Sequence, residues 1–71
     1  MRIMRPWTER HAQAERHVDD GRRIIDRQRV LIERQKALGS DTAESETLLA
    51  SFERSQAIFE GDLVRILKER G

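Results

Sequence analysis

Two histidines are the first candidates for chemistry, because each has an acidic residue about one helical turn away. His11 and Glu15 are four residues apart, and His17 and Asp20 are three apart. On a helix either pair could hold a metal ion from one side, but a stable site needs further ligands. The chain has no cysteine and no Glu-x-x-His pattern of the kind that di-iron bundles use. We therefore expect no metal site and no cofactor.

Nucleophilic catalysis has no candidate either. None of the serines at positions 40, 45, 51 and 55 belongs to a nucleophile elbow or a glycine-rich loop. We assign no catalytic residue and expect a protein that is not an enzyme.

Arginine is the most abundant charged residue of the first half. Residues 1–39 hold ten of the fourteen basic and six of the thirteen acidic residues, which gives about +4, whereas residues 40–71 carry about −3. The basic residues of this segment include Arg16, Arg22, Arg23, Arg27, Arg29, Arg34 and Lys36. A basic helix can neutralise phosphates, so binding to nucleic acid is an alternative function. The acidic second half of the same chain and acids four residues away offer closer partners, so nucleic acid is not the expected partner.

Two long segments with helical apolar spacing must position these residues. The 71 residues are 38% charged and 37% hydrophobic, a balance typical of long exposed helices. Apolar or small residues recur at three- and four-residue steps. They are Ala14, Val18, Gly21, Ile24, Ile25, Leu31, Ile32 and Leu38 in the first segment, and Leu48, Leu49, Phe52, Phe59, Leu63, Ile66 and Leu67 in the second. We predict helices over about residues 9–38 and 42–69.

The turn between the helices is predicted at residues 39–41. Gly39 suits the left-handed conformation that ends a helix. Ser40, Asp41 and Thr42 all suit the N-cap of the next helix, and Asp41 with Glu44 resembles a capping box. Residues 1–7 are expected to form a flexible arm, and residues 8–71 the hairpin. Gly61 could bend or break the second helix.

The predicted fold is an all-α antiparallel hairpin of two helices, similar to a coiled coil. Pairing residues whose numbers sum to about 80 sets Gly21 opposite Phe59 and Arg27 opposite Glu53. Polar residues also fall in the stripes, namely Gln28, Gln35, Ser55 and Gln56. One seam of this kind gives a chain of this length little core. We therefore predict a homodimer in which two hairpins form a four-helix bundle. Val30, Ile58 and Val64 lie outside the stripes and could widen that interface.

The expected compartment is the cytoplasm. The sequence holds no apolar run long enough to span a bilayer, and Met1–Trp7 lacks the hydrophobic core of a signal peptide. The lack of cysteine agrees with a reducing compartment.

Short motifs spread over about residues 10–70 carry a resemblance to known proteins. They are His17-Val18, Gly21, Arg23-Ile24, Arg27-Gln28-Arg29, Leu31-Ile32-Glu33-Arg34, Gly39-Ser40-Asp41-Thr42-Ala43 and Leu48-Leu49-Ala50-Ser51-Phe52-Glu53. With them the chain resembles a family of short helical-hairpin proteins of unknown function from alphaproteobacteria. The resemblance implies a bacterial source and supplies no activity, substrate or functional residue. From the residues themselves we expect a small non-enzymatic protein-interaction or regulatory module, with an unidentified protein as a further possible partner.

Overall fold

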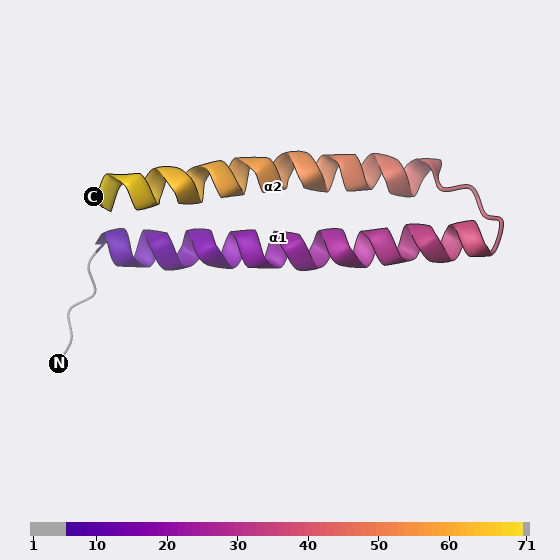
Figure 1. The fold of residues 1–71 in the computed structure, drawn as a ribbon, viewed down its shortest axis with the longest axis horizontal. Helices are drawn as coiled ribbons and strands as arrows, with labels where there is room; N and C mark the ends of the chain where they lie inside the picture. Colours follow the sequence, from indigo (N-terminus) through magenta and orange to yellow (C-terminus); the bar gives the residue numbers. More distant parts are fainter. Residues whose placement is uncertain (1–5, 71) are drawn as a thin grey trace.

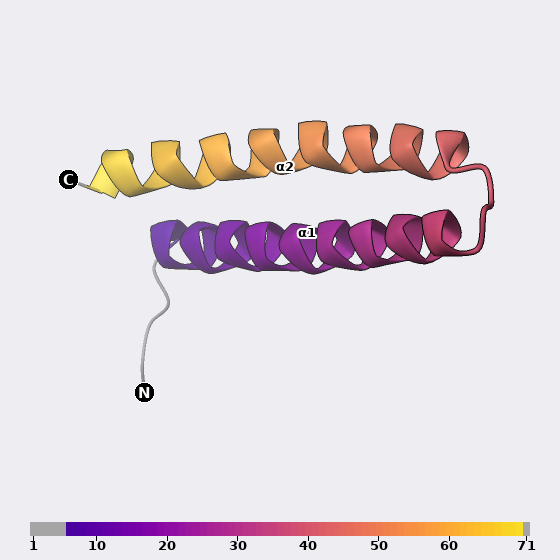
Figure 2. The ribbon, with the colours of Figure 1, turned by 45° about the vertical axis from the view of Figure 1, so that its right-hand side comes forward.

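Two antiparallel helices make up the structure. The computed structural model describes the backbone of residues 6–70 and the side chains of residues 9–69. Helices α1 (Pro6–Ala37) and α2 (Ala43–Arg70) lie side by side, with the loop at one end and the start of α1 beside the end of α2 (Figure 1, Figure 2). The predicted all-α hairpin is confirmed. Over the residues described, neither helix is long and apolar enough to cross a bilayer.

Helix α1 begins at Pro6, three residues before the expected start at Glu9. Proline suits the first turn of a helix, because the N–H that it lacks would have no helical partner there. Glu9 adds a negative charge to the same turn, where the helix dipole favours it. The expected arm over residues 1–7 therefore overlaps α1 at Pro6 and Trp7, and residues 1–5 lie outside the described residues.

A Schellman motif ends α1. Gly39 has a φ of 73°, so the predicted left-handed conformation is confirmed. The N–H of Ser40 donates to the carbonyl of Gln35 at 2.8 Å, and the N–H of Gly39 donates to the carbonyl of Lys36 at 3.1 Å. These two bonds satisfy carbonyl groups that the end of a helix leaves without partners. They also turn the chain towards α2.

The start of α2 uses two side chains as caps. Asp41 Oδ1 accepts the N–H of Ala43 at 2.9 Å, and the Thr42 hydroxyl donates to the Glu46 carboxylate. The Thr42 carbonyl accepts the first helical bond, from the N–H of Glu46 at 2.9 Å, which makes Thr42 the N-cap. Thr42 is thus the one of the three expected candidates that forms the N-cap, and its hydroxyl bonds Glu46 in place of the capping box expected from Asp41 and Glu44. Helix α2 then continues through Gly61 without a break.

A narrow seam between the helices holds the core. Its members recur at alternating three- and four-residue steps, which keep them on the facing sides of the two helices. They are His11, Ala14, Val18, Gly21, Ile25, Gln28, Ile32 and Gln35 in α1, and Ser45, Leu49, Phe52, Gln56, Phe59, Leu63 and Ile66 in α2. Ile25 and Ile32 expose only 7% and 5% of their surface. We call this set of residues the seam.

The middle of the seam is polar. Gln56 exposes 6% of its surface, and its Nε2 donates to the Val18 carbonyl at 2.9 Å and to the Glu60 carboxylate at 3.1 Å. A Cβ atom on Gly21 would lie 1.8 Å from Gln56 Oε1. The expected register sets Phe59 opposite Gly21, whereas in the structure the Gln56 amide fills this space. The lack of a Cβ at Gly21 therefore leaves the space that the amide occupies.

Candidate protein-interaction surface

The histidines that could bind metal lie in different surroundings. His11 Nε2 lies 3.6 Å from Glu15 Oε2, so the first expected pair is brought together. Asp20, the expected partner of His17, instead pairs with Arg23 at 3.0 Å. Within residues 9–69, no three His, Cys, Asp or Glu side chains gather closely enough to hold a metal ion.

The serines are spread over the loop and α2. Ser45 is buried in the seam, where its carbonyl accepts the Gln28 Nε2 group at 2.9 Å. Ser40, Ser51 and Ser55 are exposed. Among the described side chains, one hydrogen bond involves a serine hydroxyl. In it, the Arg54 guanidinium group donates to Ser51 Oγ at 3.3 Å. This arrangement offers no activated nucleophile.

Two arginines of α1 cross to carboxylates of α2. Arg29 lies 3.0 Å from Glu53, and Arg22 lies 3.9 Å from Glu60. The expected register pairs Glu53 with Arg27, whereas Arg29 makes this contact in the structure. Both pairs are about half exposed, which limits the stability that each adds to about 0.2–1 kcal/mol. Their spacing of seven residues places both pairs along one side of the hairpin.

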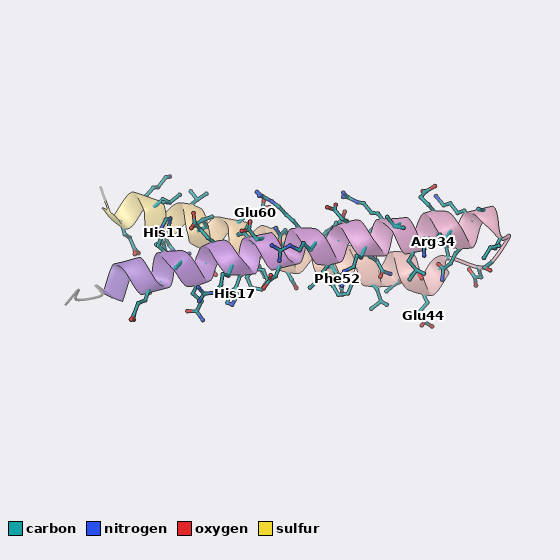
Figure 3. The ribbon with its side chains drawn as sticks, turned by 90° about the horizontal axis from the view of Figure 1, so that it is seen from below. His11, His17, Arg34, Glu44, Phe52 and Glu60 are labelled. Carbon is teal, nitrogen blue, oxygen red and sulfur yellow. The ribbon has the colours of Figure 1, made fainter. Side chains whose placement is uncertain are left out.

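These ion pairs mark one flank of the seam, which we call the charged flank. It comprises Arg22, Arg29 and Lys36 of α1 and Glu46, Glu53 and Glu60 of α2, each set at seven-residue intervals. Shallow grooves run along it, and one is lined by both Lys36 and Glu46. Figure 3 shows Glu60 at one edge of the hairpin, with His11, and shows His17 and Phe52 at the other edge. The second edge is chemically different.

On that second edge α1 presents a row of aliphatic side chains. Ile24, Leu31 and Leu38 are seven residues apart and therefore lie on one side of the helix. They expose 38%, 42% and 81% of their surface. His17 lies seven residues before Ile24, and its ring packs against Phe59 of α2 with the centroids 5.1 Å apart. This contact places the aliphatic row beside Phe59.

Helix α2 completes this surface. Phe52 lies seven residues before Phe59 and is half-buried at the same side of the seam. Leu48 lies one turn before Phe52 and is 45% exposed. We call Ile24, Leu31, Leu38, Leu48 and Phe52 the apolar face. Figure 3 shows Phe52 of this face and Glu60 of the charged flank at opposite edges of the hairpin.

The apolar face corrects the single broad stripe that the spacing predicts. Ile25 and Ile32 are buried in the seam, whereas their neighbours Ile24 and Leu31 are exposed. The contact between two helices is narrow, so each helix buries only the side chains that point directly at the other. Ile24 and Leu31 lie beside that contact and stay exposed to solvent. The signal for this division is a seven-residue repeat within the stripe. The expected interface residues Val30, Ile58 and Val64 are exposed, at 50%, 64% and 51%.

A groove of about 310 Å³ continues the same side towards the open end of the hairpin. His17, Phe59, Arg10 and Arg65 are among the residues that line it. Arg10 pairs with Glu69 at 3.3 Å, and Arg65 pairs with Asp62. Because carboxylates already neutralise both guanidinium groups, the groove gives little attraction to an anion. The side is thus apolar near the loop and polar near the open end.

Comparisons of the chain with protein-family models, with curated proteins and with solved structures find no match. Function therefore has to be inferred from the surfaces of the hairpin.

Proposed function

We propose that the protein is a small cytoplasmic, non-enzymatic protein-interaction module that binds through its apolar face. Its first partner is a second copy of the chain, so that two coiled-coil-like hairpins form a homodimeric four-helix bundle. The observation that supports this proposal is the contrast between the two sides of one seam. The charged flank satisfies its own charges within the hairpin, whereas Leu31 and Leu48 on the opposite side are 42% and 45% exposed.

Burial of the apolar face gives a favourable free energy of the right size. Full burial of a Leu or Ile side chain is worth about 1.5–3 kcal/mol, so the exposed part of Ile24, Leu31 or Leu48 is worth about 1 kcal/mol. Leu38, at 81% exposed, adds about 2 kcal/mol where the partner covers it. Two copies contribute these amounts twice. The sum of about 10 kcal/mol lies within the range of the cost of association, about 4–15 kcal/mol, so the dimer that we propose is a reversible one.

The ion pairs of the charged flank disfavour the nucleic-acid alternative. Arg22 and Arg29 already have carboxylate partners on α2. Phosphate groups would have to displace Glu60 and Glu53 from these contacts. The two arginines of α1 that lie along the charged flank are thus paired within the hairpin, so we place the function on the apolar face.

Sedimentation equilibrium over a wide range of protein concentration tests the proposal. The wild-type chain is expected to be a dimer, and Leu31→Glu is expected to be monomeric while its far-UV circular dichroism stays helical. Val30→Glu is the matched control, because Val30 is the next residue, has a similar exposure of 50% and lies outside both the seam and the apolar face. A folded wild-type monomer at every concentration, or equal effects of the two substitutions, would contradict the proposal.

A further inference from the structure

The apolar face changes character along the hairpin. Near the loop it carries Leu31 and Leu38 on α1 and Leu48 on α2. Seven-residue steps towards the open end lead to His17 on α1 and Asp62 on α2, and both line the polar groove there. A partner that buries this face with apolar side chains must therefore place them over the half of the face that lies near the loop.

Leu31 and Leu48 lie at the same level along the hairpin. Their next residues in the sequence, Ile32 and Leu49, line one groove between the helices. Leu31 and Leu48 are therefore neighbours across the apolar face, one on each helix.

Opposite charges border the face at nearly the same level. Arg34 follows Leu31 by three residues, and Glu44 precedes Leu48 by four, so each lies next to a leucine on the side away from the seam. Both side chains are exposed. Among the described residues neither makes an ion pair within the hairpin. The face thus has a basic edge on α1 and an acidic edge on α2.

A two-fold axis parallel to the helices fits this pattern. It places α1 of each copy over α2 of the other, keeps both loops at the same end and preserves the level of every residue. Leu31 then faces the partner's Leu48, and Arg34 lies beside the partner's Glu44. The symmetry forms each of these contacts twice.

A copy turned end to end fits less well. Its polar half would cover the loop half of the apolar face, so that Leu31 and Leu48 would meet the region of the partner's His17 and the partner's Asp62. Aliphatic side chains would lose the apolar contacts that bury them, and Asp62 would lose solvent around its ion pair with Arg65.

We propose that two copies dock through their apolar faces with both loops at the same end, held in register by two contacts between Arg34 and the partner's Glu44. This arrangement rests on the proposed function, because it specifies how the second copy sits on the same surface.

Charge exchange tests the arrangement. Arg34→Glu and Glu44→Arg should each weaken the homodimer by about tenfold or more, since each variant sets like charges together twice. An equimolar mixture should form a heterodimer with an affinity within about threefold of the wild type, because both contacts are then between opposite charges. Arg23→Glu mixed with Glu33→Arg is the control for net charge, as both residues are exposed and lie outside the apolar face. Restoration by the first mixture alone supports the docking.

Two outcomes would overturn it. If the wild type is a dimer but the mixture is no tighter than either variant alone, the orientation is wrong and the proposed function stands. If the wild type is a folded monomer, both proposals fail.

Cross-linking gives an independent measurement on a chain that has no native cysteine. With a short bismaleimide, Ser40→Cys should cross-link to itself through the loops. A mixture of Ser40→Cys and Lys68→Cys that cross-links mainly between the two variants would show an end-to-end partner and refute the arrangement.

Discussion

Replacement of Gly21 by alanine tests the contact at the centre of the seam. In an exposed helix, Gly→Ala stabilises the folded state by about 0.5–1 kcal/mol, because alanine loses less backbone entropy. Gly61 provides this reference in the same protein, since a Cβ there would have no neighbour within 4 Å. At Gly21, however, a Cβ would lie 1.8 Å from Oε1 and 2.8 Å from Cδ of Gln56. The Gln56 side chain must therefore move.

The expected magnitude follows from what that movement breaks. Gln56 would lose the hydrogen bond from its Nε2 to the Val18 carbonyl, worth about 1 kcal/mol. It would also lose packing in a site where it is only 6% exposed, which costs about 1–2 kcal/mol more. After the helix-propensity gain is subtracted, Gly21→Ala should destabilise the protein by about 1–2 kcal/mol. Gly61→Ala should stabilise it by about 0.5–1 kcal/mol.

Urea unfolding followed by circular dichroism at one fixed protein concentration measures both effects. A double-mutant cycle with Gln56→Ala then isolates the contact. Without the Gln56 amide, Gly21→Ala should become neutral or stabilising, which gives a coupling energy of about 2 kcal/mol. If Gly21→Ala stabilises the wild type as Gly61→Ala does, or if the coupling energy is below about 0.5 kcal/mol, the account of Gly21 as the space for Gln56 is refuted.

The loop gives two further predictions, both measured by urea unfolding at the same protein concentration. Gly39→Ala should cost about 1 kcal/mol or more, because alanine is strained at a φ of 73°, and a neutral result would contradict the Schellman ending. Asp41→Ala should lower the free energy of unfolding by about 1 kcal/mol, because the hydrogen bond from the Ala43 N–H is lost. Asp41→Asn keeps an acceptor oxygen and should lower it clearly less. Equal losses would show that the charge of Asp41 matters rather than its hydrogen bond.

The hairpin itself can be predicted from local rules. A three- and four-residue apolar spacing on each side of Gly39 is enough to give two helices and a turn, because helix formation and capping depend on neighbours in the sequence. The start of α1 is harder, since Pro6 is compatible with both a loop and a first helical turn.

The alignment of the two helices is less accessible to sequence. Charge matching places Arg27 opposite Glu53, whereas Arg29 makes that contact at 3.0 Å. Many charged residues on both helices allow several alignments with similar numbers of matched pairs, and each exposed pair is worth little. The alignment that the helices adopt also has to fit the Gln56 side chain against Gly21. This packing contact cannot be predicted from the pattern of charges.

The division of the apolar stripe explains why the surface escaped the sequence pattern and why it indicates a partner. Hydrophobic spacing identifies Ile24 and Leu31 as inward-facing, but the width of one helix contact limits how many rows are covered. In the single hairpin the usual order of burial is inverted. Gln56 and Ser45 expose 6% and 8% of their surface, whereas Leu31 and Leu48 expose 42% and 45%. Polar side chains at the centre and leucines on one side are a costly arrangement for an isolated pair of helices. In a four-helix bundle the same leucines become core and the glutamine becomes an alignment element between two layers, so the inversion disappears when a second hairpin covers the apolar face.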